Sequence, residues 1–161
     1  MGEPVAMEIS SDTQKRLLAV ASGGGHWEQL MQLRDAFGGH RIHYATTLAG
    51  LPERENLASF SIIPDCNRDK KIDSLRCVVS ILKIVIRIRP QAIITTGSLP
   101  GVIALAIGKL FRIKTIWVDS VANAETLSMS GMQAKRFADL WITQWEHVAK
   151  ESGAVYAGSV L

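Results

Sequence analysis

Short apolar runs alternate along the chain with longer segments in which apolar residues recur at helical spacing. The apolar runs predict strands at 16–21, 41–46, 60–64, 91–96, 114–119, 140–144 and near 154–157. The periodic segments predict helices at 26–37, 73–89, 101–111 and around 132–139. Because strands and helices alternate through short loops, the pattern predicts an α/β fold. We expect a single Rossmann-like domain, with a parallel sheet covered by helices on both faces.

Length and composition fit one such domain. The chain has 161 residues, of which 47% are hydrophobic and 20% are charged, enough for one sizeable core and too few for two. We expect residues 1–14 to be a flexible polar N-terminus and residues 15–161 to form the domain. The net charge of +3 produces no global field that would attract nucleic acid, so we expect no nucleic-acid partner.

The two cysteines, Cys66 and Cys77, have no C-x-x-C spacing and no paired histidines nearby. We therefore expect no metal site, no disulfide framework and no cofactor, in a reducing cytoplasmic setting. The first residues lack the charged-then-apolar pattern of a signal peptide. No apolar run reaches the ~18–20 residues that span a bilayer. We expect any membrane attachment to be peripheral.

Three loops are candidates for a ligand site, because ligands bind such sheets beyond the carboxyl ends of the strands. The loops at 22–28, 97–101 and 120–131 are rich in Gly, Ser, Asn and acidic residues. The first reads SGGGHWEQ, and its glycines let the backbone pass close to a ligand while the next helix offers free N–H groups to an anion. This pattern makes Ser22, Gly23, Gly24 and Gly25 candidate phosphate-binding residues.

Two familiar phosphate motifs do not fit this first loop. No Gly-Lys-Ser/Thr follows it, so it is not a Walker loop, and Glu28 stands where a dinucleotide-binding motif has its third glycine. A tight turn without a ligand remains the alternative. His26 at the helix start is a candidate general base, although it could equally cap the helix or bond a neighbouring loop. Glu28 is an acceptor-binding candidate whose place in the first helical turn also suits the helix dipole.

The other two loops add polar groups. In TTGSLPG, Gly97 and Ser98 could donate hydrogen bonds to phosphate oxygens. A hydrolase nucleophile elbow requires Gly-x-Ser-x-Gly, and the Gly directly before Ser excludes it here. The third loop contributes a candidate carboxylate pair that could act as base or orient sugar hydroxyls, Asp119 and Glu125, with Ser120 and Asn123 as binding candidates. The alternative is a polar loop in which Asp119 only holds a turn or cap.

The predicted helix at 73–89 is unusually apolar. At 100° per residue, Arg76, Lys83 and Arg87 fall on one narrow stripe, and nearly all other positions are apolar. This apolar arc is wider than a helix needs to cover a sheet. The excess predicts contact with a membrane interface, where the three cations would meet anionic head groups, or with a partner chain. A buried helix whose cations reach out to solvent is the alternative.

Taken together, three segments resemble one known family: SGGGHWEQL, TTGSLPG and WVDSVANAETLSMSGMQAKRFADLWITQWE. It is the acceptor-side, membrane-associated subunit of bipartite UDP-sugar glycosyltransferases. The family includes PssD-type exopolysaccharide and capsule subunits and the anchoring subunit of the dolichol-linked UDP-GlcNAc transferase. The similarity runs from about Lys15 to the end of the chain. Its most specific elements are the Ser-x-Ser-Gly at 128–131 and the pairs Ala138-Asp139 and Gln144-Trp145.

The resemblance implies a fold like the N-terminal half of a GT-B glycosyltransferase, with a separate Rossmann-like chain as the donor-binding half. It implies a hexosyltransferase subunit, inactive without that partner, which transfers a sugar from a partner-bound UDP-sugar to a lipid-diphosphate-linked saccharide in polysaccharide biosynthesis. The glycine loop and Gly97-Ser98 would face the acceptor, with His26, Glu125 or Asp119 as base. Some members of the family have an N-terminal transmembrane anchor, whereas this sequence begins with a polar stretch. We therefore expect peripheral attachment at the cytoplasmic face of the membrane.

Two other functions stay open at this point. The chain could be a non-catalytic scaffold that recruits and activates the partner at the membrane. A nucleotide-binding enzyme is a further alternative, which the broken glycine spacing disfavours. The sequence identifies neither the sugar nor the acceptor.

Overall fold

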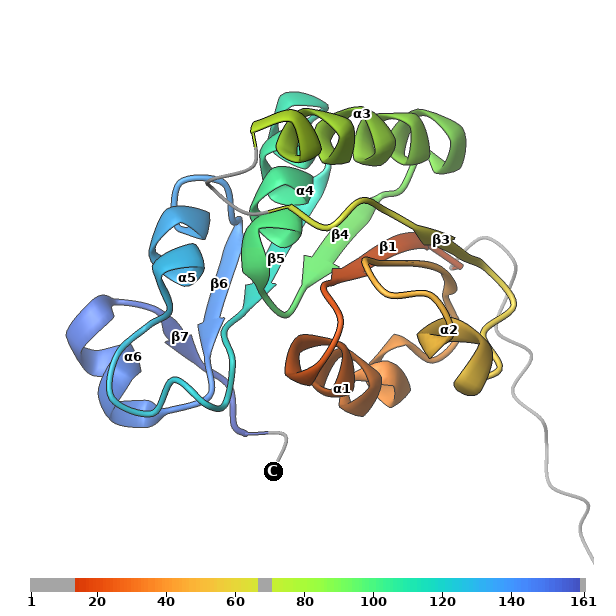
Figure 1. Cartoon of the computed structure of the whole chain (residues 1–161). Helices are drawn as coiled ribbons and strands as arrows, with labels where there is room; N and C mark the ends of the chain where they lie inside the picture. The colour runs from red at the N-terminus through yellow and green to blue at the C-terminus, as the bar shows by residue number, and fades with distance from the viewer. Residues whose placement is uncertain (1–13, 67–70, 160–161) are drawn as a thin grey trace, which may run out of the picture.

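The computed structural model describes residues 14–66 and 71–159, so the predicted flexible N-terminus lies, apart from Gln14, outside the described residues. It contains a seven-stranded parallel sheet in the order β3-β2-β1-β4-β5-β6-β7 (Figure 1). The strands are β1 (Arg16–Ala21), β2 (Arg41–Thr46), β3 (Phe60–Ile62), β4 (Ala92–Thr95), β5 (Lys114–Val118), β6 (Leu140–Thr143) and β7 (Val155–Tyr156). Each predicted strand is confirmed, with its ends within two residues.

The helices are α1 (Gly25–Gln32), η2 (Arg34–Phe37), α2 (Leu51–Arg54), α3 (Lys71–Ile88), α4 (Ser98–Leu110), α5 (Met129–Ala134) and α6 (Glu146–Ser152). Two predicted helices differ. The segment 26–37 breaks into an α-helix and a short 3-10 helix, and the helix predicted around 132–139 is α5, which begins earlier because Ser128 caps it. The short helices α2 and α6 were not predicted.

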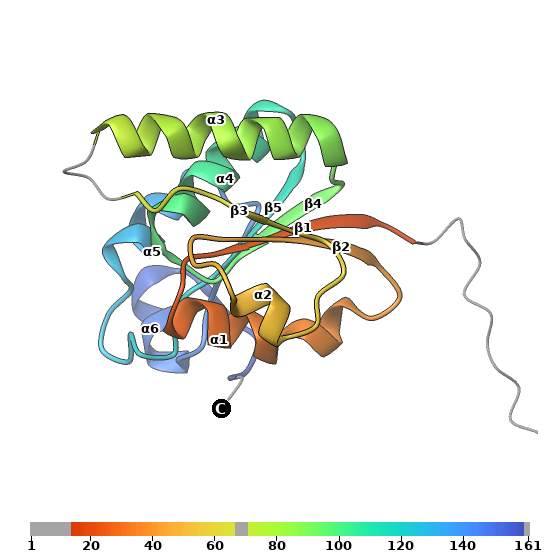
Figure 2. The ribbon, with the colours of Figure 1, turned by 45° about the vertical axis from the view of Figure 1, so that its right-hand side comes forward.

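The strand order explains where a ligand site forms. From β1 the chain moves outward to β2 and β3, returns through α3 to β4, and then moves outward in the opposite direction. Because such crossovers are right-handed, the two halves place their helices on opposite faces of the sheet. Figure 2 shows α1 and α2 below the sheet and α3 and α4 above it. The direction reverses between β1 and β4, the switch point at which ligands bind.

Alternation along β1 fills the core on both faces. Leu18 and Val20 are buried against the helices α3 and α4, whereas Ala19 and Ala21 face the α1 side. On the α1 side, the Trp27 ring packs edge-on against Tyr44 with 6.1 Å between ring centroids. The two alanines are small, which leaves room for Trp27 and Leu30 of α1 on this face of the sheet.

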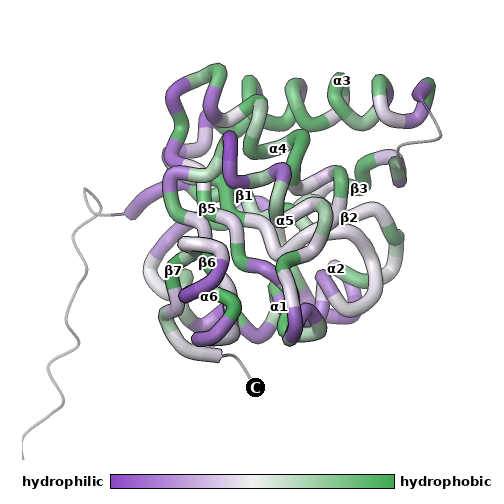
Figure 3. The backbone as a smooth tube through the Cα atoms, turned by 90° about the vertical axis from the view of Figure 1, so that its left-hand side faces the viewer, coloured by the Kyte–Doolittle hydropathy of each residue, from purple (hydrophilic) through white to green (hydrophobic). Residues whose placement is uncertain are grey.

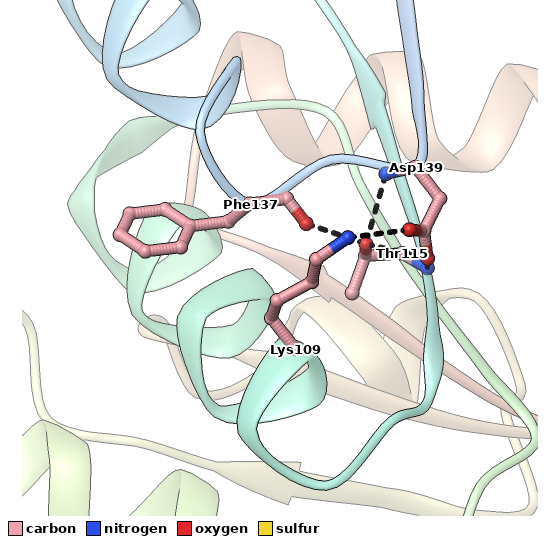
Figure 4. Close-up of polar contacts among 4 residues, drawn as sticks. All are labelled: Lys109, Thr115, Phe137 and Asp139. Carbon is pink, nitrogen blue, oxygen red and sulfur yellow. Dashed lines mark hydrogen bonds and ion pairs between the residues drawn. The ribbon is translucent and has the colours of Figure 1, made fainter.

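A network of polar contacts lies at the amino ends of β5 and β6, at the opposite end of the strands from the switch-point loops (Figure 4). Lys109 at the end of α4 forms an ion pair of 2.7 Å with Asp139, whose carboxylate also accepts from the backbone N–H of Thr115. The Thr115 hydroxyl donates to the Phe137 carbonyl oxygen at 2.6 Å and accepts from the Asp139 N–H at 3.0 Å. The hydrogen bond from Lys109, more than any other contact, lowers the pKa of Asp139. The network ties α4, β5 and β6 together.

Candidate functional site

The three predicted loops meet at one cavity. Its volume is about 340 Å³, and its lining comes from the starts of α1, α4 and α5 and from Cys66 after β3. The lining residues are His26, Cys66, Ser98, Leu99, Ser128, Met129 and Ser130. The cavity lies beyond the carboxyl ends of β1 and β4, where the sheet topology places a ligand.

The orientation of His26 is fixed from the neighbouring strand. Its Nδ1 lies 2.9 Å from the carbonyl oxygen of Thr96, and the Thr96 hydroxyl donates to the His26 carbonyl oxygen at 2.6 Å. Because a carbonyl oxygen can only accept, Nδ1 carries a proton, and in the neutral ring Nε2 is then the acceptor. Gly97 makes room for the ring, since a Cβ there would lie 2.3 Å from two imidazole atoms. His26 therefore does bond a neighbouring loop, which was the alternative to a catalytic role. The bond uses Nδ1 and leaves Nε2 able to accept a proton.

Two helix N-termini border the cavity. The residues before α1 and α4 are glycines with positive φ, Gly24 at 76° and Gly97 at 146°, and neither helix has a side-chain cap. The Trp27 N–H donates to the Gly24 carbonyl oxygen, and Pro100 has no N–H, so the first-turn N–H groups without an intrahelical partner are those of Gly25 and His26 in α1 and of Ser98 and Leu99 in α4. They lie at the positive ends of the two helix dipoles. Ser98 adopts a φ of 65°, and its buried hydroxyl has no partner among the described residues. These features favour an anion between the two helices.

The glycine loop itself contributes less uniformly than predicted. The Gly23 N–H donates to the Thr47 hydroxyl at 3.1 Å, so this amide is engaged within the protein. Ser22 is half-buried, and Gly24 and Gly25 are exposed. The amides at the start of α1 that remain available for a ligand are therefore those of Gly25 and His26. Glu28 is exposed and does not line the cavity.

Asp119 organises the third loop from inside the protein. It is 1% exposed, and its carboxylate accepts bonds from the indole N–H of Trp117, the amide of Asn123, and the N–H and hydroxyl of Ser128. Four donors saturate its lone pairs. This geometry corresponds to the alternative in which Asp119 holds a turn or cap.

The Ser-x-Ser-Gly element at 128–131 follows from the same carboxylate. The Ser128 hydroxyl donates to Asp119 at 2.7 Å and accepts from the Gly131 N–H at 2.8 Å, which caps α5. Residue 131 must be glycine, because a Cβ there would lie 2.5 Å from an Asp119 carboxylate oxygen. The element therefore fixes where α5 begins, and with it the Ser128–Ser130 wall of the cavity.

Side chains after β6 hold the third loop from the other side. The Gln144 amide donates to the Asp119 carbonyl oxygen at 3.0 Å, and the Trp145 indole N–H donates to the Val121 carbonyl oxygen at 2.8 Å. His147 contacts the Ala124 carbonyl oxygen. These bonds give the Gln144-Trp145 pair a physical role: it shapes the loop between β5 and α5.

The remaining predicted residues of this loop lie outside the cavity. Asn123 bonds Asp119, and the Ser120 hydroxyl accepts from the Ala122 N–H at 3.2 Å. Glu125 is exposed, so the structure does not bring the carboxylates of Asp119 and Glu125 to the cavity wall. Within residues 14–66 and 71–159, no three His, Cys, Asp or Glu side chains gather in a way that could hold a metal ion.

Sequence reasoning missed three residues near His26. Thr96 orients the imidazole, and Cys66 lines the cavity although it is far away in the sequence. Gln29 lies one helical turn after His26 and is 5% exposed, with both polar atoms of its amide lacking a partner among the described residues. A Gln inside the GGGHWEQ segment gave a signal, since polar residues three apart share a helix face.

The predicted apolar excess of α3 is exposed. Cys77, Ile81, Ile84 and Val85 face the core, and the opposite side carries Ile72, Leu75, Val79 and Ile86 with 70, 64, 41 and 56% exposure. Figure 3 shows this hydrophobic helix along the outer edge of the molecule. Arg76 and Lys83 are exposed beside this apolar face, whereas Arg87 donates to the Ser61 hydroxyl at 3.2 Å. In the part of the chain that the structure describes, no helix is long and apolar enough to cross a bilayer.

Comparisons with solved structures show the fold. MurG from Acinetobacter baumannii matches with a TM-score of 0.68 and 14% identity, over 90% of this chain and 44% of that one. MnaA of S. aureus, solved with UDP, matches with a TM-score of 0.70 and 10% identity over 91% and 44%. UDP-GlcNAc 2-epimerase from Methanocaldococcus jannaschii gives 0.65 and 12% over 84% and 41%. The chain spans less than half the length of each, and the predicted fold class, half of a GT-B architecture, is confirmed.

Sequence comparison gives the family. No curated protein matches the chain. A family model described as "Oligosaccharide biosynthesis protein Alg14 like" matches residues 69–160, which is more than half of the chain. The matched region includes the Gly97-Ser98 turn, the Asp119 loop with its Ser-x-Ser-Gly cap, and the Gln144-Trp145 pair. The chain therefore belongs to the Alg14-like family of oligosaccharide biosynthesis proteins.

Proposed function

We propose that this chain is the acceptor-binding half of a two-chain inverting glycosyltransferase. The enzyme would transfer a sugar from a UDP-sugar to a lipid-diphosphate-linked saccharide in polysaccharide biosynthesis. Family membership and the fold shared with MurG support a glycosyltransferase-related role. The observation that carries the proposal is the cavity at the switch point, where an oriented imidazole lies beside two uncapped helix N-termini.

Membership of the Alg14-like family supports a two-chain arrangement. The described fold corresponds to one of the two halves of MurG and MnaA. A GT-B transfer cleft lies between two Rossmann-like units, so one unit supplies only one wall. A donor-binding Rossmann-like chain, with the UDP-sugar bound to it, would supply the other wall. We expect the isolated chain to have no transferase activity.

We propose a distinct role in this reaction for each of these residues. The N-termini of α1 and α4, with Ser98, would bind the diphosphate of the acceptor. A hydroxyl of the acceptor saccharide attacks the anomeric carbon, the bond to UDP breaks, and the hydroxyl proton passes to Nε2 of His26. Asp119 acts as a positioning residue, because its carboxylate is occupied by the loop that forms the Ser128–Ser130 wall. Glu125, exposed in the same loop, is the other candidate base.

The test is His26→Gln, assayed with the partner chain present. We expect kcat to fall by about 10²–10⁴-fold, the usual contribution of a general base, with partner affinity unchanged. His40→Gln is the matched control, since His40 lies in the turn before β2 and outside the cavity. Glu125→Gln should leave kcat within about twofold of the wild type if His26 is the base.

A different outcome would identify the scaffold. If His26→Gln, Asp119→Asn and Glu125→Gln all keep full turnover in the complex, the partner holds every catalytic group. The chain would then supply only acceptor affinity and location at the membrane. Measurable affinity of the isolated chain for NAD would instead revive a nucleotide-binding enzyme.

The exposed apolar face of α3 supports peripheral attachment to a membrane. We propose that this attachment is at the cytoplasmic side. Four exposed apolar side chains, flanked by Arg76 and Lys83, have the composition of an interfacial helix. Replacing Arg76, Lys83 and Arg87 with Glu should release the protein from anionic liposomes in a flotation assay. Leu75→Gln should weaken binding to neutral and anionic vesicles alike. Unchanged binding of both variants would assign the contact to another surface, and a docked partner chain would then be the occupant of α3.

A further inference from the structure

A second cavity lies at the amino ends of β1 and β2, whereas His26 lies beyond the carboxyl end of β1. Its volume is about 450 Å³, and it is formed by the first residues of β1 and β2, by Ser59 just before β3 and by the end of α3. Three arginines line it, Arg16, Arg41 and Arg87, together with His43 and Ser59. Arg16 and Arg41 are register partners on adjacent parallel strands, which places their side chains next to each other.

This cavity concentrates positive charge without a counter-charge. No carboxylate lines it, and no carboxylate of the described residues lies within 4.0 Å of any of the three guanidinium groups. Converging like charges repel one another unless an anion lies between them. Burial lowers the pKa of His43 to about 4, with the charge of Arg87 as the smaller cause.

The arginines are also held in place. Nε of Arg16 donates to the carbonyl oxygens of Ile88 and Arg89 at 3.1 Å, and Nε of Arg41 donates to the Gln14 amide oxygen at 2.9 Å. Arg87 is held by Ser61 at 3.2 Å. These bonds fix the side chains through one nitrogen each and leave the other guanidinium donors for a ligand. Preorganised arginine forks match the several oxygens of a phosphate group.

We propose that this cavity binds a phosphate-bearing anion, with Arg16, Arg41 and Arg87 as its cationic ligands. The site is separate from the acceptor cavity at the switch point, and the proposal does not depend on transferase activity. Because the cavity adjoins the end of α3, a phosphomonoester headgroup of a membrane lipid is one source of the anion. Soluble phosphate is the other.

The experiment uses the full-length ¹⁵N-labelled chain, titrated with inorganic phosphate at constant ionic strength. The side-chain Nε–Hε signals of the three arginines should shift together and saturate, while that of Arg136 should not. Arg41→Gln and Arg87→Gln should each weaken phosphate affinity on the order of tenfold. Arg136→Gln, which removes one exposed charge elsewhere, is the matched control. Thermal melts should check that each variant is folded.

A second arm distinguishes the sources, with phosphatidylcholine vesicles that contain or lack phosphatidic acid. If Arg41→Gln weakens binding of both phosphate and phosphatidic acid vesicles, the ligand is a lipid headgroup. If it weakens only phosphate binding, the ligand is soluble; both results support the site. The proposal is overturned if shifts grow linearly and equally across all arginines. It is also overturned if folded Arg41→Gln and Arg87→Gln bind phosphate as tightly as Arg136→Gln.

Discussion

Gly97→Ala tests how closely the candidate base is fitted to the backbone. An added Cβ would lie 2.3 Å from Cε1 and Nδ1 of His26, so the ring must move away from the Thr96 carbonyl oxygen. The φ of 146° at Gly97 lies in a region that side chains disfavour by about 1–3 kcal/mol. The lost hydrogen bond adds about 0.5–1.5 kcal/mol. We expect the free energy of unfolding to fall by about 2–4 kcal/mol.

The matched control is Gly25→Ala in the neighbouring glycine loop. Gly25 begins α1, its φ is not positive, and a Cβ there would meet nothing within 4 Å. Alanine is a better helix former than glycine, so this variant should be as stable as the wild type or more stable by up to about 1 kcal/mol. Urea titration followed by tryptophan fluorescence measures both variants, with Trp27 buried next to the site.

A double-mutant cycle separates the two contributions. In a His26→Ala background the added methyl group has no ring to meet, so only the backbone cost should remain. The cycle should therefore give a coupling energy of about 1 kcal/mol between positions 26 and 97. Two results would refute this explanation. One is a free energy of unfolding for Gly97→Ala within about 0.5 kcal/mol of that for Gly25→Ala, and the other is a coupling energy of zero.

Three further predictions concern buried or paired ionisable groups. Asp119→Asn presents an N–H donor to groups that already donate, so unfolding free energy in denaturant should fall by about 2–4 kcal/mol; a loss under 0.5 would contradict its positioning role. Burial lowers the His43 pKa from 6.5 to about 4, so its contribution is complete above pH 6.5 and is lost as pH falls toward 4. The difference in stability between wild type and His43→Gln should thus shrink by about 3 kcal/mol over that window, and a flat difference would be inconsistent. The Lys109 bond lowers the pKa of Asp139, so its stabilisation exists above the unfolded pKa near 3.8 and disappears as pH falls through the lower folded value. Asp139→Asn should remove this acid dependence from the unfolding curve, and parallel curves for the two proteins would argue against it.

The pattern of apolar and polar residues was enough to predict the fold class and the end of the sheet at which the candidate site lies. Strands such as Arg16–Ala21 and Lys114–Val118 are apolar runs that only a sheet buried on both faces accommodates. Their alternation with helices sets the topology, and the topology puts the glycine-rich loops at one edge. The sequence pattern did not predict α2 and α6, because helices of one or two turns have too few apolar positions to show a helical period.

The tertiary structure alone decided which polar residues face the cavity. Asp119, Glu125 and His26 are equivalent as candidate bases in the sequence, yet Asp119 is buried among four donors, Glu125 is exposed, and His26 is oriented by Thr96. Hydrogen bonds between residues 70 positions apart leave no local pattern. The convergence of Arg16, Arg41 and Arg87 on one cavity is hidden for the same reason: strand pairing and the return of α3 bring them together, and neither is written in the spacing of residues along the chain.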